Sequence, residues 1–201
     1  YQYRVGIPSV IVAFQNNAEH KRGLDRAAIT LPALMKNGGY TTALFGKWHL
    51  GYSREFNPLH YGFDKFQGYL SGQIDYHSHV DLAGNFDWWN GFDQSKEEGY
   101  STHLITHYAT DFIREKKDQP FFLVVSHEAV HGPYQGPGDT AFRVAGSPSS
   151  EAPKGQVLKD KKQAFKLMMQ EMDKSIGEIV KTLKDVGCEE NTFIFFLSDN
   201  G

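Results

Sequence analysis

Three short runs of β-branched and aromatic residues constrain the fold of this chain most strongly. They occupy residues 41–45, 121–126 and 192–197, and two of them are apolar at nearly every position. A strand that is apolar on both faces must be covered on both faces, as in a parallel sheet flanked by helices. The pattern therefore predicts strands buried inside an α/β sheet in preference to half-solvated antiparallel strands.

A segment with helical spacing of apolar residues precedes each run. We expect the first helix at residues 31–37 with Thr30 as its cap, and the second to be capped by Ser101. The third, at about residues 161–186, carries its apolar side chains on one face and ends at Gly187. Helix followed by strand, repeated, predicts an α/β fold in which helices flank a mostly parallel mixed sheet.

Composition excludes several classes of protein. The chain has 201 residues, of which 40% are hydrophobic and 22% charged, a balance that is ordinary for a folded domain. A net charge of -3 with no basic stripe argues against nucleic acid as a partner. The apolar runs are far shorter than the roughly 20 residues of a membrane span. A single cysteine, Cys188, excludes an internal disulfide and is interpreted as a surface thiol.

Two long segments, residues 51–99 and 132–155, separate these units and are rich in Gly, Pro, aromatic and small polar residues. Loops of this length in a compact domain are usually functional or disordered. The first segment contains many aromatic side chains, in which disordered segments are poor. We therefore expect an ordered, substrate-facing insertion at about residues 52–99.

Asp75 and His79 stand out within this insertion because Trp88 and Trp89 follow them. Hydrogen-bonding side chains beside aromatic faces are a common way to hold a sugar. The sequence thus suggests that Asp75 and His79 bind a saccharide substrate. A structural loop with a stacked aromatic cluster is the alternative interpretation of the same residues.

Polar and ionisable residues follow directly after each of the three apolar runs. They form the clusters Gly-Lys-Trp-His-Leu-Gly at 46–51, Ser-His-Glu-Ala-Val-His-Gly-Pro at 126–133 and Ser-Asp-Asn-Gly at 198–201. In open α/β sheets the ligand crevice lies at the carboxyl ends of the strands. A cation, imidazoles, a carboxylate and a carboxamide are therefore expected at one edge of the sheet, a set that fits an oxyanion beside a hard metal ion.

The residue types suit the cleavage of a sulfate ester. Lys47 can offset the charge that builds on the sulfuryl oxygens, and a histidine can protonate the leaving oxygen. Asp199 and Asn200 offer only oxygen ligands, which suit Ca²⁺ or Mg²⁺ better than zinc. Taken singly, Lys-Trp-His is more often a surface turn and Asp-Asn-Gly a plain turn. Their recurrence after all three predicted strands favours the functional interpretation.

The same residues resemble the type I sulfatases of the alkaline phosphatase-like superfamily. The stretch Gly-Tyr-Thr-Thr-Ala-Leu-Phe-Gly-Lys-Trp-His-Leu-Gly at residues 39–51 looks like the second signature of that family, a long and specific match. Residues 120–137 resemble the family's strand and histidine loop, and residues 193–201 resemble its metal-binding strand end. Val130 departs from the pattern, since relatives carry a proline there.

The resemblance implies a formylglycine nucleophile, which a maturation enzyme makes from a Cys or Ser in a Cys/Ser-x-Pro-x-Arg motif. That motif and the Asp pair that precedes it do not occur in the sequence. We therefore expect residues 1–201 to be the central part of a single sulfatase catalytic domain, inactive by itself. By the same resemblance, the parent protein is expected to be secreted, periplasmic or lysosomal.

Carried over residue by residue, the resemblance assigns Lys47 to the formylglycine and the sulfate, and His49 to the formylglycine hydrate. His131 is similar to the histidine that contacts the sulfate and is the candidate acid for the leaving group. Asp199 and Asn200 look like ligands of Ca²⁺, in preference to Mg²⁺. His127 is either part of this set or a residue that supports it from behind.

Two other functions stay open on sequence alone. One is hydrolysis or transfer of a phosphoester or phosphonate by a relative of the same superfamily; Gly-Lys-Trp-His at residues 46–49 argues for the sulfatase instead. The other is a non-catalytic relative that keeps the fold for an aromatic carbohydrate-binding cleft. An intact Cys/Ser-x-Pro-x-Arg motif in the parent protein would indicate an enzyme.

Overall fold

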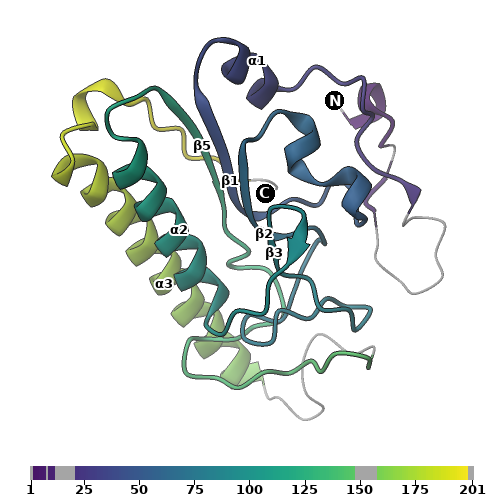
Figure 1. Ribbon diagram of the computed structural model, residues 1–201. Coiled ribbons are helices and arrows are strands. Elements are labelled where there is room, and N and C mark those ends of the chain that lie inside the picture. The colour runs from purple at the N-terminus through teal and green to yellow at the C-terminus, as the bar shows by residue number, and fades with distance from the viewer. Residues whose placement is uncertain (1, 8, 12–20, 148–157, 199–201) are drawn as a thin grey trace.

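A computed structural model of the chain describes residues 2–7, 9–11, 21–147 and 158–198 (Figure 1). Its centre is a 5-stranded sheet in the order β4-β3-β2-β1-β5. β1 (Thr41–Lys47) pairs in parallel with both β2 (Lys65–Tyr69) and β5 (Phe121–Ser126). The short strands β3 (Trp89–Asn90) and β4 (Asp93–Gln94) add antiparallel pairing at one edge. The predicted mixed sheet, parallel at its centre, is confirmed.

Two long helices lie on one face of this sheet (Figure 1). α2 (Ser101–Lys116) packs against the strands, and α3 (Leu158–Asp185) runs beside α2. The short helix α1 (Leu31–Asn37) precedes β1. Four 3-10 helices complete the regular structure of the described residues: η1 (Gln2–Val5), η3 (Arg54–Phe56), η4 (Pro58–Tyr61) and η5 (Glu189–Asn191). Within those residues, no helix combines the length and apolarity that a membrane crossing requires.

The helix ends follow the sequence closely, with one difference. Thr30 caps α1 as predicted, because its hydroxyl accepts a hydrogen bond from the backbone N–H of Ala33 at 3.3 Å. Helix α2 begins at Ser101, but its N-cap residue is Tyr100, so the predicted cap is wrong by one position. The chain leaves α3 through Gly187, which has a left-handed φ of 77°.

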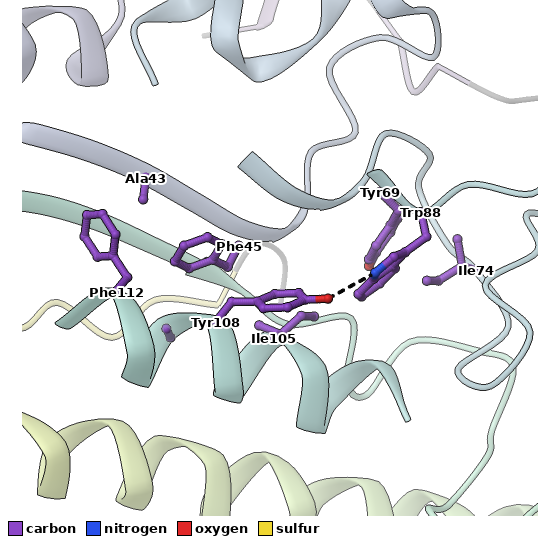
Figure 2. Close-up of a cluster of buried hydrophobic side chains, with 9 residues drawn as sticks. Ala43, Phe45, Tyr69, Ile74, Trp88, Ile105, Tyr108 and Phe112 are labelled. Carbon is purple, nitrogen blue, oxygen red and sulfur yellow. Dashed lines mark hydrogen bonds between the residues drawn. The ribbon is translucent and has the colours of Figure 1, made fainter. Parts of the chain in front are cut away.

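The two faces of β1 are buried against different parts of the chain. Phe45 points towards α2, where its ring lies 5.8 Å from the ring centroids of both Tyr108 and Phe112 (Figure 2). Leu44 points the other way and packs with Phe66 and with the segment that follows β1. Burial on both faces explains why this strand is apolar at nearly every position.

Two of the sequence predictions about strands need correction. β2 lies inside residues 52–99, which the sequence presents as an irregular insertion; pairing with β1 makes it a strand. The predicted strand at 192–197 is wrong, because this segment has no ladder partner among the described residues. Its large apolar side chains are exposed, Phe193 at 92%. An apolar run forms a strand only where a neighbour offers backbone hydrogen bonds.

Candidate active site

The carboxyl ends of β1 and β5 lie side by side and bring two of the predicted clusters together. In the parallel register, Gly46 is level with both Ser126 of β5 and Gly68 of β2. Lys47 therefore emerges at the same sheet edge as the histidine segment 127–131. The sequence prediction of convergent strand ends is supported for these two clusters.

Glycine at position 46 is what permits this close approach. Its φ is +108°, and a Cβ placed there would lie 2.1 Å from the carbonyl oxygen of Ser126. Any side chain would therefore force β1 and β5 apart. Gly68 is in the same situation, with a Cβ position 2.1 Å from the carbonyl oxygen of Gly46. Three strands thus meet tightly just where the candidate residues begin.

His49 is held in a fixed orientation after β1. Its φ is +56°, a left-handed conformation that is uncommon for a residue with a side chain. The ring Nε2 lies 3.0 Å from the carbonyl oxygen of Ile11, which also accepts a hydrogen bond from the Tyr52 hydroxyl at 2.7 Å. Because a carbonyl oxygen only accepts, Nε2 carries the proton and Nδ1 is the acceptor of the neutral ring.

His131 lies exposed in the loop after β5. Its Nδ1 donates to the carbonyl oxygen of Gly132 at 2.9 Å, so Nε2 is the nitrogen that can exchange a proton with a ligand. The backbone around it is anchored, since its N–H donates to Glu128 and its carbonyl oxygen accepts from the Tyr76 hydroxyl at 3.0 Å. An exposed imidazole on an anchored backbone suits proton transfer.

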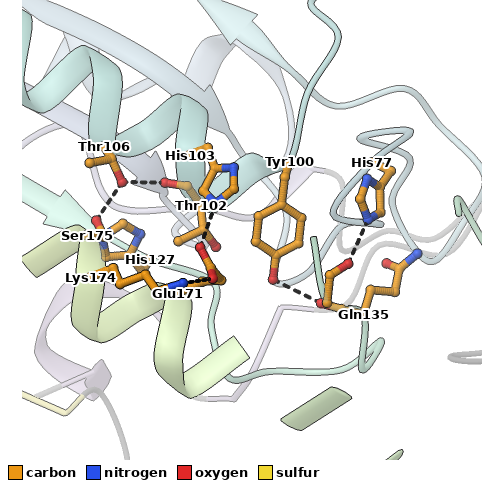
Figure 3. Close-up of polar contacts among 11 residues, drawn as sticks. His77, Tyr100, Thr102, His103, Thr106, His127, Gln135, Glu171, Lys174 and Ser175 are labelled. Carbon is orange, nitrogen blue, oxygen red and sulfur yellow. Dashed lines mark hydrogen bonds and ion pairs between the residues drawn. The ribbon is translucent and has the colours of Figure 1, made fainter. Parts of the chain in front are cut away.

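His127 belongs to a buried hydrogen-bond chain behind the strand end (Figure 3). The Thr106 hydroxyl donates to the carbonyl oxygen of Thr102 at 2.6 Å, so it must accept from Ser175 at 2.6 Å. Ser175 has then used its only hydrogen and accepts from Nε2 of His127 at 2.8 Å. Burial lowers the pKa of His127 to about 4, so the ring is neutral. His127 thus joins the end of β5 to both helices, an arrangement that favours the second of its two predicted roles, support from behind the site.

Asp75 is placed differently from the sequence prediction. It is fully buried, with 0% exposure, and both of its oxygens accept hydrogen bonds from the protein. The donors are the backbone N–H groups of His77, Ser78, Phe142 and Arg143 and the side-chain amide of Gln135. This carboxylate joins the segment after β2 to residues 135–143. Its saturation with donors argues against direct contact with a substrate.

His79 is also buried, with 1% exposure. Its Nε2 donates to the carbonyl oxygen of Gly99 at 3.1 Å, and its ring stacks on Trp88 at a centroid distance of 4.3 Å. Burial lowers its pKa to about 4. Trp88 itself is a core residue whose indole N–H lies 3.3 Å from the Tyr108 hydroxyl (Figure 2). The stacked structural cluster, the alternative interpretation of these residues, is the better description.

Glu128 received no role of its own in the sequence prediction. It is buried, and its Oε1 accepts the backbone N–H of Ile74 at 2.7 Å. Burial raises its pKa well above the usual value, while the charges of Arg143 and Lys47 act to lower it. The sequence feature that could have pointed to Glu128 is its position directly after an apolar strand. A signal of this kind does not reveal that the side chain turns inward.

The predicted metal ligands, Asp199 and Asn200, lie outside the described residues. Within residues 2–7, 9–11, 21–147 and 158–198, no group of three His, Cys, Asp or Glu side chains is arranged to hold a metal ion. Asp199 and Asn200 therefore remain the candidate metal ligands, with no alternative group of this kind among the described residues. Their carboxylate and carboxamide oxygens suit a hard cation such as Ca²⁺.

The fold and the paired strand ends define an α/β protein with its candidate residues at the carboxyl edge of parallel strands, where proteins of this architecture bind their ligands. A family model described as Sulfatase matches residues 6–201. The chain therefore belongs to the sulfatase family.

Relatives and solved structures agree with this assignment. The chain is 32% identical over 192 residues to N-acetylgalactosamine-6-sulfatase of Mus musculus, covering 89% of the chain and 34% of that protein. It is 32% identical over 218 residues to arylsulfatase J of Mus musculus, covering 100% of the chain and 33% of that protein. The chain thus spans about a third of the length of these curated relatives.

The crystal structure of Ps i-CgsB in complex with k-i-k-neocarrahexaose matches the fold with a TM-score of 0.71. The sequence identity is 22%, over 94% of this chain and 42% of that one. This likeness supports the predicted alkaline phosphatase-like fold class.

Proposed function

We propose that this chain forms the central part of the active site of a sulfatase that hydrolyses sulfate esters of a carbohydrate. The observation that carries the proposal is the meeting of Lys47 and the His131 loop at adjacent ends of β1 and β5, in a chain of the sulfatase family. A fixed cation and an accessible imidazole at one sheet edge can bind a sulfate ester and protonate its leaving group.

Each of the three described residues has a distinct proposed role. Lys47 binds the sulfuryl oxygens and offsets the charge that grows on them as the ester bond breaks. His131 transfers a proton from Nε2 to the leaving oxygen, which requires the imidazolium form because Nδ1 already donates to Gly132. His49 presents Nδ1 as an acceptor, held by Ile11 on the opposite side of the ring. That geometry suits an orienting hydrogen bond to the hydroxyl of a formylglycine hydrate.

The formylglycine and a calcium ion complete the proposal. Asp199 and Asn200 would hold Ca²⁺, which supplies positive charge beside the sulfate when it is bound. The formylglycine is expected from a Cys or Ser of the parent protein, converted by a maturation enzyme. Secretion, or a periplasmic or lysosomal location, belongs to the same proposal.

A sulfated carbohydrate is proposed as substrate because of what similar proteins act on or bind. One relative is by name an N-acetylgalactosamine-6-sulfatase, and one structural neighbour was solved with k-i-k-neocarrahexaose. Asp75 and His79 are left out of the proposed substrate contacts because both are buried and hydrogen-bonded within the protein.

Leaving-group dependence tests the two main roles in the enzyme that contains this chain and its formylglycine. His131→Ala should slow a sugar sulfate far more than nitrophenyl sulfate, whose phenolate leaves without a proton. Lys47→Ala should slow both substrates by a similar factor, on the order of 10²–10³, because the sulfuryl oxygens are common to both. Lys166→Ala, at an exposed position on α3, is the matched control and should leave kcat/KM unchanged.

Equal losses on both substrates for His131→Ala would remove its role as the acid and leave it as a sulfate ligand. Full activity of Lys47→Ala on both substrates would contradict the proposed site as a whole.

A further inference from the structure

Glu128 is a buried acidic side chain that the proposed reaction leaves without a task, although it lies in the loop between β5 and His131. It follows β5 directly, and Lys47 ends the neighbouring strand β1. Gly46 and Ser126 are level in the parallel register, and parallel neighbours lie about 4.8 Å apart. Glu128 and Lys47 therefore leave the sheet at the same edge.

The two carboxyl oxygens of Glu128 have unequal surroundings. Oε1 accepts the backbone N–H of Ile74 at 2.7 Å, which ties the segment after β2 to the loop after β5. Oε2 is buried and has no hydrogen-bond partner within the part of the chain that the structure describes. The whole residue is only 4% exposed. A buried carboxylate with a single hydrogen bond is costly, and the neutral acid is less so in the same place.

Several charged groups face Glu128 from different elements. Burial raises its pKa and is the largest cause, the charges of Arg143 and Lys47 lower it, and Asp75 raises it. The hydroxyls of Tyr76 and Tyr100 also face the cluster, but they donate to the carbonyl oxygens of His131 and Gln135.

Two of these charges are set by the fold. Asp75 is saturated with donors, and the guanidinium of Arg143 donates to Val80 at 3.3 Å and to Gln73 at 2.6 Å. Lys47 differs because, in the proposed function, an incoming anion changes its electrostatic surroundings. Of the charges that act on Glu128, the net charge around Lys47 is therefore the one that changes when substrate binds.

We propose that Glu128 is a positioning residue that couples one proton to the anion beside Lys47. Before an anion binds, the charge of Lys47 favours the ionised carboxylate; a bound anion offsets that charge and favours the neutral acid. The proton comes from solvent and is placed on Oε2, the oxygen without a partner. Oε1 accepts from Ile74 in both states, so the loop contact persists while the negative charge that would compete with a sulfate group is removed.

The coupling is testable without any ligand, because Lys47→Met removes the same charge that an anion offsets. The measurement is the carboxyl ¹³C shift of Glu128 against pH by NMR. We expect the Glu128 midpoint to lie above that of an ordinary glutamate, and to move further up in Lys47→Met. Lys65→Met is the matched control: Lys65 contacts Glu115 at 2.6 Å and lowers its pKa, so that variant should raise the Glu115 midpoint and leave Glu128 unchanged.

A Glu128 midpoint that is ordinary, or that does not move in Lys47→Met, overturns the proposal. If Lys47→Met fails to fold, the test is the binding of inorganic sulfate to the wild-type chain as a function of pH. Sulfate itself does not titrate near neutral pH. We expect its affinity to fall by up to tenfold per pH unit between the Glu128 midpoints of the free and bound chain, with uptake of about one proton.

Glu128→Gln separates this coupling from the structural role of the side chain. Its amide oxygen still accepts from Ile74, but the group no longer titrates, so sulfate affinity should become independent of pH in that range. Sulfate binding in the wild type without pH dependence overturns the proposal. The sulfate arm rests on the proposed function. Absence of sulfate binding combined with a clear shift in Lys47→Met would refute the sulfate assignment and leave the coupling in place.

Discussion

Asp75→Asn distinguishes a structural carboxylate from a substrate ligand with the smallest possible change. The side chain keeps its size, but one oxygen becomes an amide group. At the Oδ1 position the amide oxygen still accepts from His77 and Ser78. At the Oδ2 position the new amide would face three donors, the side chain of Gln135 and the backbones of Phe142 and Arg143.

The cost follows from the donors that lose their acceptor. Each buried donor left unsatisfied costs about 1–3 kcal/mol, so three give an upper range of roughly 3–9 kcal/mol. Local relaxation and water entry reduce this sum, and we expect a loss of about 3–5 kcal/mol in the free energy of unfolding. That is a large part of the roughly 5–15 kcal/mol by which a domain is stable.

Urea denaturation followed by tryptophan fluorescence measures this loss. Asp93→Asn is the control, because that exposed carboxylate makes a weak 4.0 Å contact with Arg54 and the variant should change stability by less than about 0.5 kcal/mol. The structural interpretation would be refuted by an Asp75→Asn variant that unfolds like the wild type while its binding of a sulfated saccharide weakens. That outcome would restore the substrate contact that the sequence suggests.

Three further predictions concern acid stability, strand approach and the metal. The pKa of His127 falls from 6.5 to about 4 on folding, so its contribution of roughly 3 kcal/mol is present above pH 6.5 and is lost as pH falls towards 4; His127→Gln should flatten this part of the stability curve. Gly46→Ala should cost at least about 3 kcal/mol by thermal unfolding, whereas Gly138→Ala, where a Cβ meets nothing within 4 Å, should cost under 1 kcal/mol. Ca²⁺ at 100 times its Kd should stabilise the chain by about 2.7 kcal/mol, and Asp199→Ala should abolish this gain; an equal gain in that variant would contradict the ligand assignment.

The sequence predicts those parts of the fold that local pattern determines. β1 and β5 are apolar on both faces, and the helices carry periodic apolar residues, so each was visible in a single segment. β2 was missed because Lys65–Tyr69 contains a glycine and polar residues, and pairing with β1 makes it a strand. The run at 192–197 shows the converse: it has a strong strand pattern but no ladder partner among the described residues, so it forms no strand and its large apolar side chains stay exposed.

For the candidate site, the sequence predicted which residues lie at the sheet edge, but it did not predict which side chains are buried. Strand ends in a parallel sheet must meet, which was enough to bring Lys47 near the loop of His131. Asp75 sits among aromatic residues as a sugar ligand would, but its burial depends on Gln135 and on the backbone of Phe142, far along the chain. Contacts over such separations leave no trace in the local pattern.

The exposed apolar segment after η5 has a practical consequence for work on this chain. Residues 193–197 read Phe-Ile-Phe-Phe-Leu, without a charge or a proline, and β5 is an edge strand that pairs only with β1 among the described residues. An edge strand and an uncharged, β-prone run that is exposed each favour pairing between molecules. The chain is therefore expected to self-associate as its concentration rises. A lysine in place of Phe195 should keep it monomeric in solution experiments, because a charge within such a run opposes stacking.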